Sequence, residues 1–258
     1  MINSLLYLGL LLSFTIGIQA DEQPHSVTVE SQASNGHGLL DQTLNFSRGH
    51  QEFKDLHFKQ HEAEFVRLVE EGQSPQTLFI GCSDSRIVPE LILNVRPGDL
   101  FVIRTAGNFV PPAHFQEVDG VAATVQFAVE GLGVRHIIVC GHSHCGAIQG
   151  LFTHLDPQKF GLLKRWIQFG EEAKKLTLAM AKPSTPKEEI YSIAEKISVL
   201  FQLEHLMSFP FIKNKVDEGK IELHGWYFDI GTGEIWYYDT EQYRFKPLVG
   251  NSQAVKTK

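Results

Sequence analysis

Short apolar runs separated by amphipathic segments dominate the chain between residues 77 and 141. Thr77–Gly81, Leu100–Thr105 and His136–Gly141 are apolar almost throughout, which predicts three strands. Strands that are apolar on both faces are typical of a mainly parallel sheet covered by helices. Val118–Leu132 has apolar residues at helical spacing and predicts a helix before the third strand. The pattern therefore predicts an α/β fold with a central, mostly parallel β-sheet flanked by helices.

Periodic segments continue on both sides of this core. From Leu44 to Glu71 apolar residues recur among charged ones, which predicts an N-terminal helical arm. Gly161–Ala181 and Lys187–Phe209 predict two further amphipathic helices. Lys220–Ile230 and Glu234–Asp239 alternate as strands do on either side of a Gly-Thr-Gly turn. This last pattern predicts a C-terminal β-hairpin.

The N-terminal segment has a different pattern. Residues 1–20 carry no charged side chain, and the run from Leu5 to Ile18 is almost unbroken and apolar. This is typical of a secretory signal peptide, cut here after Ala20, and it predicts export to the periplasm or secretion. The alternative is an uncleaved anchor, although about 14 apolar residues fall short of the roughly 20 that span a bilayer. After cleavage we expect no membrane-spanning segment.

A length of 258 residues suits one large domain or two small ones behind this signal. Residues 21–43 are polar and lack periodicity, which predicts a flexible leader; we expect a single domain over 44–248 and a short tail over 249–258. With 43% hydrophobic residues the chain can build a sizeable core, and a net charge of −7 without basic blocks argues against nucleic-acid binding. Asn45-Phe-Ser47 fits the acceptor pattern for N-glycosylation.

Two motifs follow the first and the third predicted strand directly. They are Cys82-Ser-Asp-Ser-Arg86 and His142-Ser-His-Cys145. Because sites in open α/β sheets form beyond the carboxyl ends of strands, we expect the two motifs to converge. Cys82, His142 and Cys145 would then supply two thiols and an imidazole to a Zn²⁺ ion. Three protein ligands leave the fourth tetrahedral position open, as in zinc enzymes that activate water.

The same residues allow other interpretations. Cys82 and Cys145 could form a disulfide, since exported chains tend to pair their cysteines. The zinc could be structural, although structural sites normally have four Cys or His ligands. His144 competes with His142 for the imidazole position; we favour His142, because the His-x-x-Cys spacing lets one turn wrap around the ion. Cys140 lies in an apolar run and is interpreted as a buried small hydrophobe.

Asp84 and Arg86 lie two and four residues after the first cysteine. Paired with the guanidinium, the carboxylate would stay ionised and could accept a hydrogen bond from a zinc-bound hydroxide. Released from Arg86, Asp84 could bind the zinc as a fourth ligand in a closed state of the site. We therefore expect a catalytic pair that can also act as a switch.

Three motifs together resemble those of the β-class carbonic anhydrases: Cys82-Ser-Asp-Ser-Arg86, Arg104-Thr-Ala-Gly-Asn108 and Gly141-His-Ser-His-Cys-Gly-Ala147. The resemblance implies reversible hydration of carbon dioxide to bicarbonate and a proton by attack of zinc-bound hydroxide. It implies that Cys82, His142 and Cys145 hold the zinc and that Asp84 and Arg86 are the catalytic pair. It also implies a homodimer or a higher even oligomer.

The resemblance is closer to a plant-like subclass of that family. This subclass has Gln nine residues before the first cysteine and Phe in a Pro-Gly-x-x-Phe segment, where this chain has Gln73 and Phe101. It usually has Tyr where this chain has Phe127, and the other subclass has Trp where this chain has Phe79. Gln73, Phe101 and Phe127 are therefore candidate substrate-binding residues. The Gly146 backbone amide, at the start of a predicted helix, could also donate a hydrogen bond to substrate.

Two rival functions remain open from the sequence. The same zinc site could hydrolyse carbonyl sulfide or carbon disulfide, because the attack on carbon would be the same. The chain could also be a non-catalytic module that binds zinc or bicarbonate, although it keeps all five ligand and pair residues. In the enzyme, His144 or His114 could relay the proton that hydration releases.

Overall fold

The computed structural model describes residues 39–115 and 119–248. Contacts within the chain divide it into two compact units, Met1–His57 and Phe58–Lys258, which are described separately. The predicted signal peptide, most of the predicted leader and the predicted tail over 249–258 lie outside the described residues. Within the described residues, none of the helices combines the length and the apolar character needed to cross a bilayer.

The described part of the first unit is helical. It consists of α1 (Leu39–Glu52) and the first residues of a π-helical turn, η1 (Phe53–Phe58). Residues 39–43, which the sequence assigned to the flexible leader, belong to α1. The single helix expected over Leu44–Glu71 is divided, since α2 begins only at Glu62 after a bend at His61.

The second unit holds the remaining elements. In chain order these are α2 (Glu62–Glu71), β1 (Thr77–Cys82), α3 (Pro89–Leu93), β2 (Leu100–Thr105), η2 (Ala106–Asn108), α4 (Gly120–Gln126), η3 (Phe127–Gly131), β3 (His136–His142), α5 (Gly146–Leu151), α6 (Pro157–Trp166), η4 (Ile167–Gly170), α7 (Glu171–Met180), α8 (Lys187–Met207), α9 (Pro210–Asp217), β4 (Glu222–Phe228), β5 (Ile235–Asp239) and β6 (Arg244–Pro247). The short elements α3, α9 and β6 were not predicted from the sequence.

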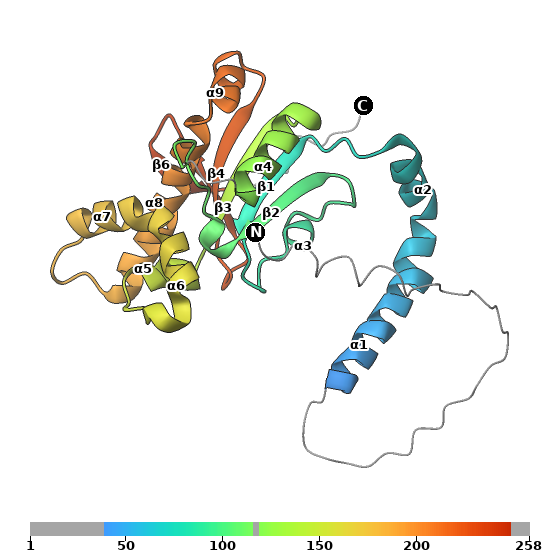
Figure 1. Ribbon diagram of the computed structural model, residues 1–258, viewed down its shortest axis with the longest axis horizontal. Coiled ribbons are helices and arrows are strands. Elements are labelled where there is room, and N and C mark those ends of the chain that lie inside the picture. The colour runs from blue at the N-terminus through green and yellow to red at the C-terminus, as the bar shows by residue number, and fades with distance from the viewer. Residues whose placement is uncertain (1–38, 116–118, 249–258) are drawn as a thin grey trace, which may run out of the picture. The chain divides into compact units, whose positions relative to one another are not determined.

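One sheet organises the second unit, with the strand order β2-β1-β3-β4-β5-β6 (Figure 1). The pairs β1–β2, β1–β3 and β3–β4 are parallel, whereas β4–β5 and β5–β6 are antiparallel. The α/β fold, the mostly parallel central sheet and the C-terminal hairpin are therefore confirmed. β6 extends the hairpin by one further strand.

The two faces of the sheet are packed against different elements. Leu78 and Ile80 belong to a buried cluster that includes residues of α4, α8 and α9. Phe79, between them in the sequence, packs on the other side with Ile138 and Cys140. This alternation is that of a strand buried on both faces, and it explains why the first three strands read as continuous apolar runs.

The strand register places the two predicted motifs at one edge of the sheet. Gly81 pairs with Cys140, so that Cys82 and His142 both lie where their strands end. α8 approaches this end of β3 closely. A Cβ on Gly141 would lie 2.7 Å from Val199 Cγ2 and 3.3 Å from the Glu195 carbonyl oxygen, so only glycine fits there without displacement.

Gln202 joins α8 to the loop at Val110 and to the helical turn η4. Its side chain is fully buried. The side-chain oxygen accepts the Val110 N–H at 2.8 Å, and its amide donates to the Phe169 carbonyl at 3.3 Å. Buried backbone groups without partners are costly, and this one side chain supplies a partner to the Val110 N–H and to the Phe169 carbonyl of η4.

We expect Gln202→Leu to lower the free energy of unfolding by about 2 kcal/mol, because the Val110 N–H and the Phe169 carbonyl lose their buried partner. Urea denaturation of the zinc-loaded protein, followed by circular dichroism, measures this loss. Gln126→Leu is the control, since Gln126 is exposed on α4 and should change stability little. Equal midpoints for the two variants would contradict the assignment.

Candidate metal centre

Cys82, His142 and Cys145 come together at the carboxyl ends of β1 and β3. Cys82 and His142 are the last residues of their strands, and Cys145 precedes α5 directly. The two sulfur atoms and one imidazole nitrogen lie within 4.8 Å of one another, and all three residues are buried. All three cysteines of the chain are free, so the alternative disulfide between Cys82 and Cys145 is not formed. His144 is exposed and does not belong to this group.

The His142 ring is already oriented for a metal. Its Nδ1–H donates to the Ser143 carbonyl at 2.9 Å, which leaves the lone pair on Nε2. The Nε2 atom is buried and has no hydrogen-bond partner within the described residues. Buried polar atoms without a partner are rare, and at a site with two free thiols a metal ion is the natural partner. The donor set therefore fits Zn²⁺.

The two thiols differ in their electrostatic environment. A hydrogen bond from the Cys145 thiol lowers the pKa of Cys82 to about 4 despite burial, and the Gly107 N–H at 3.4 Å contributes to this shift. The pKa of Cys145 is raised, because it donates to Cys82 and is itself buried. Burial also raises the pKa of Cys140 to about 12, which keeps it a neutral core residue as expected.

Asp84 and Arg86 form a two-pronged ion pair beside this group. Arg86 Nε donates to Asp84 Oδ1 at 2.9 Å, and Arg86 Nη2 donates to Oδ2 at 2.7 Å. The Arg86 backbone N–H also donates to Oδ1, at 3.0 Å. The Arg86 hydrogen bonds hold the pKa of the Asp84 carboxyl well below its usual range. Arg86 Nη2 reaches the His144 carbonyl at 3.2 Å as well, so the pair ties the two motifs together.

Arg104 supports this loop, a role that the sequence analysis missed. Its Nε donates to the Cys82 carbonyl at 3.0 Å, and its Nη2 donates to the Asp84 carbonyl at 2.6 Å. The guanidinium thus fixes the backbone on both sides of Ser83. Arg104 stands in a motif that carried the family resemblance, but the motif alone gave no sign that its target is main-chain carbonyls.

Glu195 supports the second motif from α8. Its Oε1 accepts the Cys145 N–H at 2.9 Å, and its Oε2 accepts the Tyr227 hydroxyl at 2.9 Å. The residue is only 3% exposed, and burial raises the pKa of its carboxyl. Nothing in the amphipathic pattern of Lys187–Phe209 separates this glutamate from those on the exposed face of the helix.

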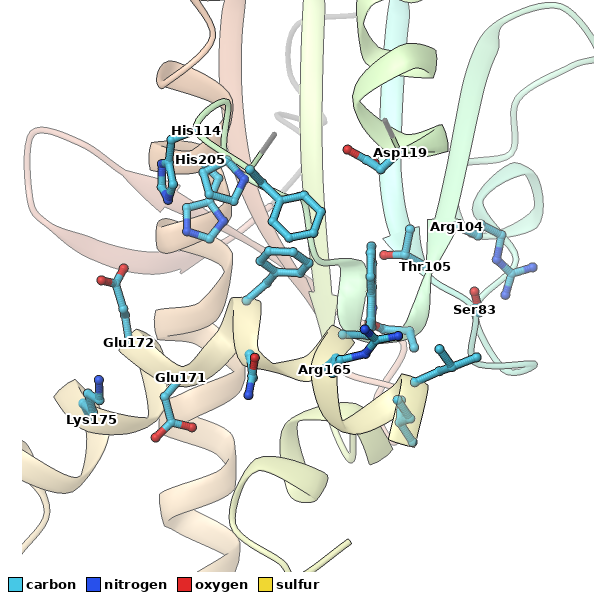
Figure 2. A pocket seen from close by; sticks show the side chains of 18 residues that line it. Ser83, Arg104, Thr105, His114, Asp119, Arg165, Glu171, Glu172, Lys175 and His205 are labelled. Carbon is cyan, nitrogen blue, oxygen red and sulfur yellow. The ribbon is translucent and has the colours of Figure 1, made fainter. Parts of the chain in front are cut away.

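A cavity of about 1070 Å³ adjoins the loop after β1 (Figure 2). Ser83 and Thr105 border it next to the metal ligand Cys82, while His114 and His205 stand across it. The Ser83 N–H donates to the Thr105 carbonyl at 2.9 Å, which joins β1 and β2 at this rim. Of the two candidate proton relays, His114 lines the cavity and His144 does not.

Of the candidate substrate-binding residues, some lie at the metal centre and others lie away from it. Gly146 opens α5 directly after Cys145, beside the metal ligands. Phe101 and Phe127 contact one another, with ring centroids 5.9 Å apart. Phe101 pairs with Leu78 in the sheet, and Leu78 lies four residues before Cys82 on β1. Four residues of a strand span about 13 Å, so Phe101 lies about that far from the ligand.

Gln73 is exposed in the segment before β1, at the other end of that strand from Cys82. Within one chain the structure therefore brings Gly146 to the metal centre, but not Gln73, Phe101 or Phe127. Their part in substrate binding stays a prediction.

Comparisons with known proteins agree with this geometry. The sequence profile of the carbonic anhydrase family matches residues 77–235. Carbonic anhydrase 1 of Escherichia coli O157:H7 is 39% identical over 206 residues, which are 80% of this chain and 92% of that protein.

Two solved structures extend the likeness to the fold. The β-carbonic anhydrase CcaA superposes with a TM-score of 0.75 at 35% identity, covering 82% of this chain and 94% of its own. A tetrameric β-carbonic anhydrase of Sordaria macrospora has a TM-score of 0.62 at 30% identity and covers 82% of this chain and 95% of its own. The chain therefore belongs to the β class of the carbonic anhydrases, zinc enzymes that reversibly hydrate carbon dioxide.

Proposed function

We propose that this chain interconverts carbon dioxide and bicarbonate at a zinc ion held by Cys82, His142 and Cys145. The observation that carries the assignment is the buried His142 Nε2, which has no protein partner among the described residues and lies within reach of two free thiols. When bound, zinc supplies Lewis-acid activation of a water molecule for attack on carbon. The chain's own residues position the reactants and remove the proton.

Asp84 is the residue that we propose to orient the attacking water. A carboxylate has about four lone-pair sites. Three hydrogen bonds from Arg86 use two sites on Oδ1 and one on Oδ2, which leaves one site on Oδ2 free. The carboxylate stays ionised beside Arg86 and can accept a hydrogen bond there. In the closed state expected from the sequence, Asp84 would be released from Arg86 before it binds the zinc.

Arg86 and Gly146 complete the polar part of the proposed site. The Arg86 side chain is 48% exposed, so the guanidinium can attract the anionic product bicarbonate while it holds Asp84. The Gly146 N–H follows the ligand Cys145 and would donate to a substrate oxygen. His144 or His114 would pass the released proton to solvent, and His114 has the better position on the cavity wall.

We propose further that the enzyme is a homodimer or a higher even oligomer. Phe127 is 51% exposed although its ring packs on Phe101, so the described residues of the second unit leave much of this apolar surface uncovered. A second copy that laid these rings over its neighbour's metal centre would supply the apolar slot that the resemblance implies. The Sordaria macrospora relative is described as tetrameric. From the apolar segment at 1–20 we propose export of the mature protein.

Asp84→Asn should reduce stopped-flow carbon dioxide hydration by about 100-fold or more, because the amide cannot accept a proton and orients water poorly. Zinc content, measured by mass spectrometry of metals, should stay at the wild-type level. Asp217→Asn is the matched control, since it removes an exposed carboxylate that pairs with Lys213 and lies outside the metal centre. Wild-type rates in Asp84→Asn, or a zinc-loaded wild type without hydration activity at any pH, would refute the proposed function.

Glu195→Ala should weaken zinc binding by about 10-fold to 100-fold, because the Cys145 N–H and the Tyr227 hydroxyl lose their common acceptor. Glu195→Gln keeps an acceptor oxygen and should recover most of the affinity. Competition with a chromophoric chelator gives both dissociation constants. If Glu195→Ala binds zinc as tightly as the wild type does, Glu195 does not hold the ligand loop in place.

Phe127→Glu should dissociate the oligomer, because a charge would have to be buried in the contact surface. Sedimentation velocity measures the mass of the assembly. Phe160→Glu is the control, since Phe160 on α6 is 46% exposed and lies outside the proposed contact. If Phe127→Glu remains an even oligomer while Phe160→Glu dissociates, the interface does not lie at Phe127.

A further inference from the structure

A second group of metal-ligating side chains lies at the opposite end of the sheet from Cys82, His142 and Cys145. It consists of His136, Glu222 and His224. His136 is the first residue of β3, whose last residue is the ligand His142. The six residue steps between them span about 20 Å, so the two groups are separate sites.

The strand register brings the three side chains to one face. β3 and β4 are parallel neighbours in the sheet (Figure 1), and His136 pairs with Glu222. Because side chains alternate along a strand, residues two apart share a face. Glu222 and His224 are two residues apart on β4 and therefore lie on the same face. The convergence thus follows from the backbone pairing that builds the core of the sheet.

Three atoms of this group form a compact triangle. His136 Nδ1 lies 3.2 Å from His224 Nε2 and 3.6 Å from Glu222 Oε2. His224 Nε2 lies 3.9 Å from the same Glu222 oxygen. Ligand bonds of about 2.0–2.1 Å at tetrahedral angles separate two donor atoms by about 3.3 Å. The two nitrogens already have this spacing, and the exposed carboxylate needs only a small rotation to match it.

The electrostatic environment favours a metal over a second proton. Burial lowers the pKa of His224, and the neighbouring His136 lowers it further. A lowered pKa favours the neutral ring, which has a lone pair for coordination. Glu222 contributes a negative charge that would offset part of the charge of a cation.

We propose that His136, Glu222 and His224 bind one divalent transition-metal ion of the zinc type. Two imidazoles and one carboxylate suit Zn²⁺, Cu²⁺ or Ni²⁺ rather than Mg²⁺ or Ca²⁺, which prefer oxygen ligands. The side chains are 42%, 69% and 33% exposed in that order, so the ion can enter from solvent and the remaining positions stay open. Bound there, it joins the beginnings of β3 and β4.

The test is calorimetric titration of Zn²⁺ into protein that already carries one zinc equivalent. We expect a second equivalent of weaker affinity in the wild type, and Mg²⁺ should give no heat of binding. His224→Gln and the more exposed Glu222→Gln should each weaken the second equivalent at least tenfold while the first is retained. His154→Gln, an exposed histidine outside both groups, is the matched control and should bind as the wild type does.

Anomalous scattering at the zinc edge should place the second ion between the two imidazoles. The inference is overturned if the wild type takes up no second equivalent at millimolar zinc. It is also overturned if both variants bind a second equivalent as tightly as the wild type does. Unchanged circular dichroism of Glu222→Gln separates a lost ligand from a lost fold.

Discussion

The parallel pairing of β1 with β3 is the constraint on which the metal centre depends. Gly81 lies opposite Cys140, so Cys82 and His142 leave the sheet at the same edge and their side chains can share one ion. Because side chains alternate along a strand, a slip of one residue would turn Cys82 to the other face and separate it from the imidazole. Burial prevents that slip. Leu78 and Ile80 on one face, and Phe79 on the other, would exchange environments if it occurred.

Around that edge the chain uses charged side chains, the exposed Arg104 and the buried Glu195, to fix backbone rather than substrate. Arg104 holds the carbonyls on both sides of Ser83, and Glu195 holds the Cys145 N–H. Both ligand loops are therefore tied down by charged side chains from other elements. A carboxylate such as Glu195 is expensive to bury unless it is hydrogen-bonded, and here each of its two oxygens accepts a hydrogen bond. In contrast, His142 Nε2 has no partner among the residues that the structure describes, and a bound metal ion would supply one.

The sequence predicted the fold and the metal ligands best where an apolar run ends directly at a residue that can bind a metal. The apolar runs at Thr77 and His136 predicted their strands almost to the residue, and the ligands followed because they stand directly at the strand ends. Arg104 and Glu195 were missed, because their targets are main-chain groups that only folding brings near. The short elements α3, α9 and β6 contain too few residues to show a period. The substrate residues were predicted by resemblance alone, and within one chain Phe101 lies a strand's length from the zinc ligands.

The two ends of β3 show how burial decides what a ligand group can be. At the carboxyl end, two thiols and an imidazole are shielded from water, so an empty site leaves a polar atom unsatisfied and metal binding is coupled to folding. At the amino end, His136 and His224 hydrogen-bond to one another at 3.2 Å and Glu222 remains hydrated. Leaving that group without a metal ion costs little free energy, because its polar atoms have other partners. An ion there must displace the hydrogen bond between the two rings and the solvent at Glu222. A buried, thiol-rich centre and an exposed, imidazole-rich one on a single strand should therefore differ in affinity and in exchange rate, even for the same metal.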